Sequence, residues 1–342
     1  MPGIGVYGLN VAVITIAIMI AIGGLFTGLG FALNNRKFKE FGIEEIFQSV
    51  INGALIGAFA VLFMPSGIIT STVNAITLSN TTSLTCSAYL SQNHAICFSY
   101  DYLVGSGYTF NGIYHPSLLA QSTGLTIGFL GLNTVLGIIA GLNINAQVID
   151  ISFSSALNPI VNQIQYFIKI LTTISISAMV QSSLLAVVAT SAIAIILPTG
   201  LVLRTFYPTR KIGGFLVAVA IGTYVIFPMS YVLNANVLDT YSINSSNSSI
   251  TQLSGSASQI ESQVVTLPSN PKISLITPII NAISGIGPAF SSLASSIISD
   301  ISYFILAAFI LPAFSLVLTI ISIKELSSIL GSEVSFGMFD LV

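Results

Sequence analysis

The chain has 342 residues, of which 54% are hydrophobic and only 6% are charged. Its nine Lys and Arg residues gather mostly at the ends of long uncharged stretches, so the apolar surface is too large to be hidden inside a water-soluble fold. The composition predicts an all-α, polytopic transmembrane helix bundle, in which residues 1–342 form a single integral membrane domain surrounded by the lipid bilayer.

In chain order, six uncharged apolar runs are long enough to cross a hydrocarbon core of roughly 30 Å at about 1.5 Å per residue. They are 10–33, 48–69, 118–142, 175–203, 213–233 and 301–323. The first run follows no basic n-region and carries no small-residue cleavage site before a soluble domain. We therefore interpret it as a retained span and not as a signal peptide.

The basic residues predict the orientation of these runs. Apart from two lysines, they lie at 36–39, at 204–211 and at Lys324. Short loops rich in Lys and Arg stay on the cytoplasmic side of a membrane, which places the turns 34–46 and 204–212 in the cytoplasm. We expect a multi-pass protein of the plasma membrane with its N-terminus outside and its C-terminus in the cytoplasm.

Two polar stretches, 70–116 and 234–271, fall on the opposite side and are predicted to be external loops. Every Asn-x-Ser/Thr sequence of the chain lies within them, at Asn80, Asn244 and Asn247. These three asparagines are candidate glycosylation sites, and their position agrees with the orientation that the basic residues predict.

The two cysteines, Cys86 and Cys97, both lie in the first of these loops. Disulfides persist outside the cytosol, so the favoured interpretation is an oxidised pair that closes a short external loop. The alternative is two free thiols. A metal site built from the two thiolates and His94 would have too few ligands for closed tetrahedral zinc.

The middle of the chain leaves two topologies open. The chain must pass from outside at Pro116 to the cytoplasm at Arg204, which requires an odd number of crossings, yet two clear apolar runs lie between these residues. Either the amphipathic stretch 150–170 also crosses, which gives seven helices in total, or 118–142 is re-entrant, which gives six. We expect seven, because an amphipathic helix is acceptable inside a bundle.

The chain lacks the motifs of several enzyme classes. It contains no P-loop, H-E-x-x-H or G-x-S-x-G sequence, and its two histidines, His94 and His115, lie in a predicted external loop. No carboxylate lies near the centre of a span, where a proton-coupled carrier usually places one. We therefore predict a protein that is not an enzyme, has no catalytic residue, and binds no cofactor or metal.

The sequence LRTFYPTRKIGG at 203–214, followed by YVIFPM at 224–229, resembles CedA, the polytopic membrane component of the crenarchaeal DNA-exchange system. This resemblance implies a relation to the multispanning channel subunit of bacterial conjugation machines. It implies small pilin-like membrane subunits and a cytoplasmic ATPase as partners, with DNA as the transported substrate and an oligomer or hetero-complex as the working form. No catalytic residue comes with the resemblance.

The expected function is a membrane channel or scaffold subunit for DNA import between cells, with Arg204, Arg210 and Lys211 as the candidate site for docking a partner. The spans carry no basic belt that would follow phosphates, so a partner supplies one or DNA touches only the basic turns. A small-molecule secondary transporter is the alternative, favoured weakly by helix-breaking residues at 198–200 and Pro312. A membrane platform for a surface pilus is a third interpretation.

Overall fold

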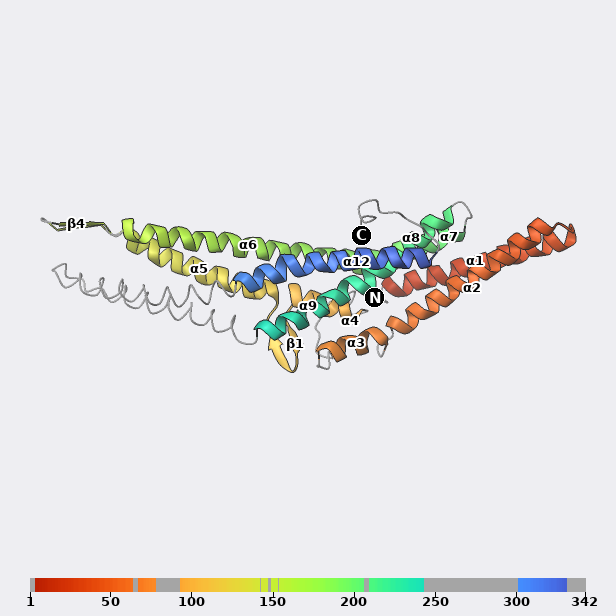
Figure 1. Cartoon of the computed structure of the whole chain (residues 1–342), viewed down its shortest axis with the longest axis horizontal. Helices are drawn as coiled ribbons and strands as arrows, with labels where there is room; N and C mark the ends of the chain where they lie inside the picture. Colours follow the sequence, from red (N-terminus) through yellow and green to blue (C-terminus); the bar gives the residue numbers. More distant parts are fainter. Residues whose placement is uncertain are drawn as a thin grey trace. The chain divides into compact units, whose positions relative to one another are not determined.

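The computed structural model describes residues 4–63, 67–77, 93–141, 143–146, 149–152, 154–205, 209–242 and 301–330 (Figure 1). The predicted all-α class is confirmed. The helices of this part are α1 (Ile4–Ala32), α2 (Arg36–Phe63), α3 (Ile68–Thr77), α4 (His94–Leu103), α5 (Leu118–Ala140), α6 (Ser154–Ser191), α7 (Leu197–Thr205), α8 (Arg210–Ile221), α9 (Phe227–Ser242) and α12 (Leu311–Ile329). Three π-helical turns also occur in this part: η2 (Ala192–Ile196) between α6 and α7, η4 (Gly222–Ile226) between α8 and α9, and η5 (Leu306–Ile310) directly before α12. The strands β1 (Tyr108–Phe110), β2 (Ile113–His115), β3 (Asn143–Ala146) and β4 (Ile149–Ser152) pair as antiparallel hairpins, β1 with β2 and β3 with β4.

The chain divides into two compact units. Unit 1 comprises Met1–His115, Gln181–Asn236 and Leu311–Val342, and unit 2 comprises Pro116–Val180 and Val237–Ile310. Each unit is therefore assembled from segments that lie far apart in the sequence. That both units belong to one membrane domain stays a prediction.

Within the described residues, four helical stretches are long and apolar enough to cross a membrane. They are Val13–Ala32, Leu157–Arg204, Arg210–Leu238 and Ile301–Ile329. They coincide with four of the six predicted runs and fit a membrane protein. The orientation of the chain and the number of crossings stay predictions.

The structure differs from the sequence analysis between residues 150 and 205. Of the stretch 150–170, expected as a separate crossing, residues 150–152 belong to strand β4, and the part from Ser154 on continues as helix into the run 175–203. Leu157–Arg204 is a single helical stretch of 48 residues. No Pro or Gly lies between 170 and 175 to end a helix there. A stretch of this length measures about 70 Å, whereas one crossing uses only about 20 residues. One crossing through it satisfies the predicted change of side between Pro116 and Arg204 only if 118–142 does not cross as well.

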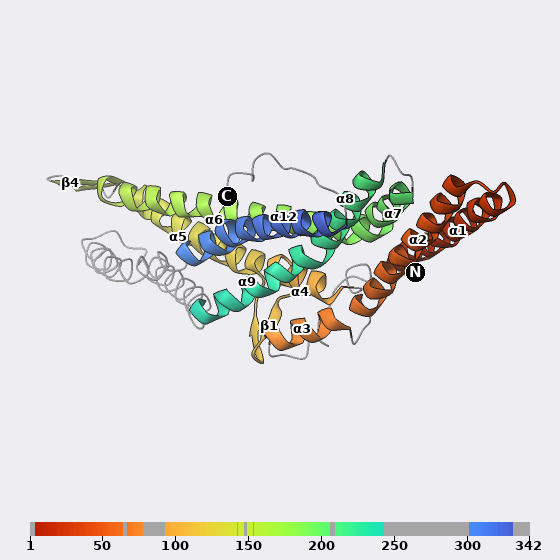
Figure 2. The same ribbon diagram turned by 45° about the vertical axis from the view of Figure 1, so that its right-hand side comes forward.

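Small residues bring neighbouring helices of unit 1 close together. Figures 1 and 2 show α1 and α2 side by side, and a Cβ atom added at Gly42 of α2 would overlap the backbone of Thr27 of α1. In the same way, a Cβ atom at Gly213 of α8 would overlap the backbone of Arg204 of α7. Close approach through small residues is the usual way in which membrane helices gain packing energy. A core of Ile56, Leu197, Leu201, Val217 and Ala220 then joins α2 to these two helices.

Each of the three π-helical turns is followed by a proline at the second position of the next helix. The prolines are Pro198, Pro228 and Pro312. Proline has no N–H, so the carbonyl four residues earlier loses its helical donor, and a π turn relieves the clash between that carbonyl and the proline ring. Side chains supply replacement donors at two of these carbonyls. Asn93 Nδ2 donates to the Tyr224 carbonyl at 2.8 Å, and Ser177 Oγ donates to the Ala308 carbonyl at 3.0 Å.

Helix α4 lies within the stretch 70–116, which was expected to be a polar loop. Eight of its ten residues are buried, because its sequence is apolar on almost every side. Asn93 caps its N-terminus by accepting hydrogen bonds from the backbone N–H groups of Ala95 and Ile96. Ile96 packs with Ala192, Ile193 and Tyr224, so α4 contacts both η2 and η4. Composition identified the polar surroundings of this segment but not the helix inside it.

Unit 2 contains α5 and residues 154–180 of α6, with the β3–β4 hairpin between them in the chain, and the rest of α6 belongs to unit 1. The hydroxyl groups of Ser122 and Ser175 form a buried hydrogen bond of 2.9 Å between the two helices. The rings of Phe129 and Phe167 pack with their centres 5.8 Å apart. A serine pair and an aromatic pair therefore hold the same two helices together.

Candidate functional site at the basic turn

The predicted docking residues lie on both sides of the connection from α7 to α8. Arg204 is in the last turn of α7, and Arg210 and Lys211 are the first two residues of α8. Thr209, at the N-cap position of α8, donates its hydroxyl to the Leu203 carbonyl at 2.7 Å and does not cap the helix. Its hydrogen bond ties the start of α8 to the end of α7.

Arg210 joins this turn to α2. Its Nη1 atom lies 2.6 Å from Glu44 Oε1, and its Nη2 atom lies 4.0 Å from Glu45 Oε2. The side chain of Arg210 is 22% exposed and that of Glu45 only 6% exposed, so the second contact is screened by little water. The stretches 34–46 and 204–212, each predicted to be a cytoplasmic turn, therefore contact each other through opposite charges. In the structure Glu44 and Glu45 lie in helix α2 and not in a turn.

Burial changes the acid–base behaviour of Glu45. Loss of solvent raises the pKa of its carboxyl above the ordinary value, the guanidinium of Arg210 works in the opposite direction, and the neighbouring Glu44 raises it further. The Glu45 carboxyl thus gains protons more easily than an exposed glutamate does. Its charge depends on the position of Arg210.

Arg204 is placed very differently from the other two docking residues. It is only 7% exposed, and neither Nε nor Nη1 has a hydrogen-bond partner among the residues that the structure describes. Because Gly213 has no side chain, the backbone of Arg204 lies directly against α8. Lys211, in contrast, is exposed. The three residues are neighbours in the chain but do not form one exposed basic patch.

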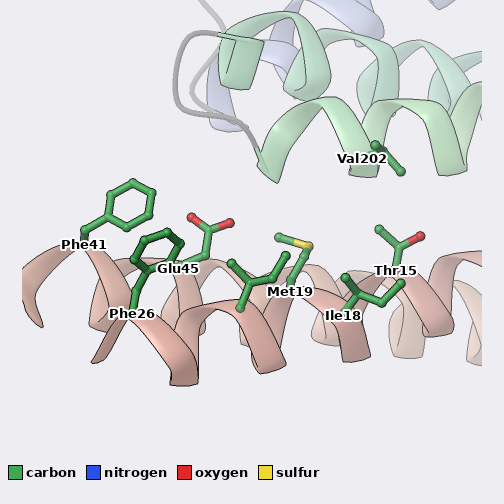
Figure 3. A pocket seen from close by; sticks show the side chains of 8 residues that line it. Thr15, Ile18, Met19, Phe26, Phe41, Glu45 and Val202 are labelled. Atoms are coloured by element: carbon green, nitrogen blue, oxygen red, sulfur yellow. The ribbon is translucent and has the colours of Figure 1, made fainter. Parts of the chain in front are cut away.

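A groove opens beside this turn, between the α1–α2 hairpin and α7 (Figure 3). Its volume is about 380 Å³, and it is lined by Thr15, Ile18, Met19, Ile22, Phe26, Phe41, Glu45 and Val202. The walls are mainly apolar, and the Glu45 carboxyl points into the space from α2. This groove was not predicted from the sequence. The pair Glu44–Glu45 inside a basic turn is the signal that could have drawn attention to it.

In the turns of α2 that follow Glu45, further polar side chains are buried on the same helix face as Glu45. Ser49 and Asn52 are fully buried, and both polar atoms of the Asn52 amide lack a hydrogen-bond partner among the described residues. Ser49 donates to the backbone carbonyl of Glu45 at 2.8 Å and is thereby satisfied. This row of polar side chains ends at Ile56, which packs on α7 and α8.

The structure describes only one of the other predicted site residues. Cys97 is buried in α4, with 3% exposure, whereas Cys86 lies outside the described residues. The disulfide between them stays a prediction. Asn80, Asn244 and Asn247 also lie outside the described residues, so their glycosylation stays a prediction as well.

No family model matches the chain, and no curated protein or solved structure matches it either. The resemblance to CedA therefore depends on the residues of 203–229. In chemical terms, the site offers ion pairing, a buried guanidinium and an apolar groove.

Proposed function

We propose that the chain is the membrane channel or scaffold subunit of a system that imports DNA between cells, energised by a separate cytoplasmic ATPase. The observation that carries this proposal is the position of the CedA-like residues. They coincide with the end of α7, with α8 and η4, and with the start of α9, and their basic turn is joined to α2 by the ion pair of Arg210 with Glu44.

Three features support this assignment. The described part has four stretches that are long and apolar enough to cross a membrane. The sequence has no P-loop, so the energy for transport comes from another subunit. The exposed Lys211 presents a positive charge on the predicted cytoplasmic side, where an ATPase would dock. Small pilin-like membrane subunits complete the proposed complex.

Copurification from native membranes tests the docking part of this proposal. We expect the chain to bring down an ATPase and a small membrane partner, and we expect Lys211→Glu to reduce the amount of ATPase. Lys37→Glu is the matched control, because Lys37 is equally exposed but lies in the other basic turn. Loss of the ATPase with both variants, or with neither, would contradict docking at the α7–α8 turn.

A secondary transporter is the second candidate, and the π-helical turns favour it. In the described part, η2, η4 and η5 each interrupt a stretch that is long enough to span a membrane. Interrupted helices expose backbone carbonyls that bind ions or substrates in carriers. Such a protein would act alone.

Liposomes containing only the purified chain separate the two candidates. The DNA-import proposal predicts no accumulation of sugars, amino acids or ions under a proton or sodium gradient. Gradient-driven accumulation of any of these by the chain alone would move the assignment to a transporter.

A further inference from the structure

The carboxylate of Glu45 is a buried charge that points into the groove between the α1–α2 hairpin and α7 (Figure 3). Its side chain is only 6% exposed. Among the described residues, its one charged contact is with Arg210 Nη2 at 4.0 Å, which is too long for a hydrogen bond. A buried carboxylate needs donors or an opposite charge close by, because it has lost most of its water. A ligand in the groove would meet this need.

The charges around Glu45 favour a cation in the groove. Those that act on its carboxyl are Arg210 and Glu44, which have opposite signs. Arg210 makes its closer contact with Glu44, at 2.6 Å. Two carboxylates therefore contact one guanidinium, and this cluster of three has one negative charge in excess when all of them are ionised. The carboxylate that faces the groove is the one that Arg210 neutralises less directly.

Two aromatic rings line the groove with Glu45. Phe41 lies one helical turn before Glu45 on α2, so the two side chains are on the same face of the helix. Phe26 of α1 packs edge-to-face on Phe41, with the ring centres 5.3 Å apart. A cation that lies over the face of such a ring is attracted to it, and organic ammonium groups are bound in this way. The rings and the carboxylate thus favour the same ligand group, a protonated amine.

The rest of the groove is suited to an apolar chain. Its walls are the aliphatic side chains of Ile18, Met19 and Ile22 on α1 and Val202 on α7. Ile18 is 55% exposed and Ile22 46% exposed, so both offer apolar surface that a ligand would cover. The volume of about 380 Å³ is that of a small-molecule site. The ligand is therefore a small amphiphile and not a segment of another protein.

The two ends of the groove match the way in which an amphiphile lies in a membrane. The candidate span of α1 ends at Ala32, and charged residues follow from Arg36 on. Charged residues that flank a span lie at the membrane surface, so the part of the groove at Phe26 and Glu45 is nearest to that surface. From Phe26 back to Thr15, α1 runs about 16 Å along the span. A polar head at Glu45 thus leaves room for a chain along α1.

We propose that this groove binds a single-chain amphiphile whose head group is a protonated amine. The amine lies against the Glu45 carboxylate and the two phenylalanine rings, and the chain lies along the aliphatic side chains of α1. The proposal does not depend on the function in DNA import, because it uses only the residues of the groove.

The test measures the binding of radiolabelled dodecylamine to the full chain in a non-ionic detergent. We expect saturable binding to the wild type. Dodecanol has the same chain without the charge, and it should displace the label only at about tenfold higher concentration. Ethylamine has the same head group with almost no chain, and it should not displace the label at the concentrations where unlabelled dodecylamine does.

Glu45→Gln keeps the size of the side chain and removes its charge, so it should weaken dodecylamine binding about tenfold and leave dodecanol binding unchanged. Glu40→Gln is the matched control, because Glu40 also lies on α2 but is exposed, pairs with Arg36 and does not line the groove. It should bind dodecylamine as the wild type does. Val202→Phe places a ring in the groove from α7 and should weaken the binding of both compounds. This variant keeps the test decisive if Glu45→Gln does not fold.

Three results would overturn the proposal. Equal affinities of the wild type for dodecylamine and dodecanol would show that no carboxylate recognises the amine. Displacement by ethylamine as effective as that by unlabelled dodecylamine would show a site for the amine alone, without the apolar groove. Unchanged dodecylamine binding in the folded groove variants would place the amphiphile elsewhere on the chain.

Discussion

The amide nitrogen of Asn93 donates a 2.8 Å hydrogen bond to the carbonyl oxygen of Tyr224, which lies four residues before Pro228. Pro228 has no N–H to offer, so this carbonyl would lack its α-helical donor. Ser99 adds a second link between the same segments by donating to the Pro228 carbonyl at 2.9 Å. A short buried helix is thus attached to the backbone of a candidate span at the point where the span is interrupted.

Asn93→Ser should separate the two roles of Asn93. A serine still caps α4, but it is too short to reach Tyr224, so a buried carbonyl loses its donor. We expect a loss of about 1–3 kcal/mol in the free energy of unfolding for this variant. Asn93→Ala should lose roughly 1 kcal/mol more, because the cap disappears as well. Unfolding curves in detergent measure both values. Equal stability of the serine variant and the wild type would show that the Tyr224 contact does not stabilise the fold.

Gly213→Ala should destabilise unit 1. The added methyl group would overlap the backbone of Arg204, and relief of the overlap requires α7 and α8 to separate. Overpacking of this kind costs about 1–3 kcal/mol or more. Gly57→Ala is the matched control, because no atom lies within 4 Å of the added Cβ in α2. Its expected effect is a gain of about 0.5–1 kcal/mol from helix propensity. A destabilised control or an unaffected Gly213 variant would contradict the packing described.

Asp101 should make stability depend on pH. Burial in α4 raises the pKa of its carboxyl from 3.8 to about 6, although the backbone N–H of Ser106 partly opposes this. The folded state therefore holds the proton more tightly than the unfolded state. The resulting stabilisation is complete below the unfolded pKa and is lost as the pH rises through about 6. The melting temperature should fall between about pH 4 and pH 6.5, and Asp101→Asn should reduce this fall. An unchanged pH profile would remove Asp101 as its source.

The sequence predicts some parts of this molecule much better than others. Long uncharged runs identify candidate spans such as 10–33 and 301–323, because hydropathy over some 20 residues is a strong signal. Short-range composition cannot identify α4, since a ten-residue, mostly apolar segment within a polar stretch is compatible with a strand, a loop or a helix. The close packing of Gly213 against the backbone of Arg204 and Gly200 arises only after α7 and α8 have folded together. The contact of Arg210 with Glu44 joins residues 166 positions apart, which no local pattern can show.

The predicted bridge between Cys86 and Cys97 can be tested directly by mass spectrometry of the unreduced protein. We expect one linked peptide pair in material kept away from reducing agents, because the loop is predicted to be external. Cys97→Ser should then leave Cys86 open to alkylation. Two alkylatable thiols in the wild type would reject the bridge. Labelling of Cys86 only from the cytoplasmic side would overturn the predicted orientation.

The most direct test of the proposed function is DNA acquisition by cells. A strain that lacks the chain is mixed with a genetically marked mating partner, and the fraction of cells that gain the marker is counted. We expect this fraction to collapse in the deletion strain while growth stays normal, and we expect the wild-type chain to restore it. Undiminished marker acquisition in the deletion strain would contradict a role in DNA import.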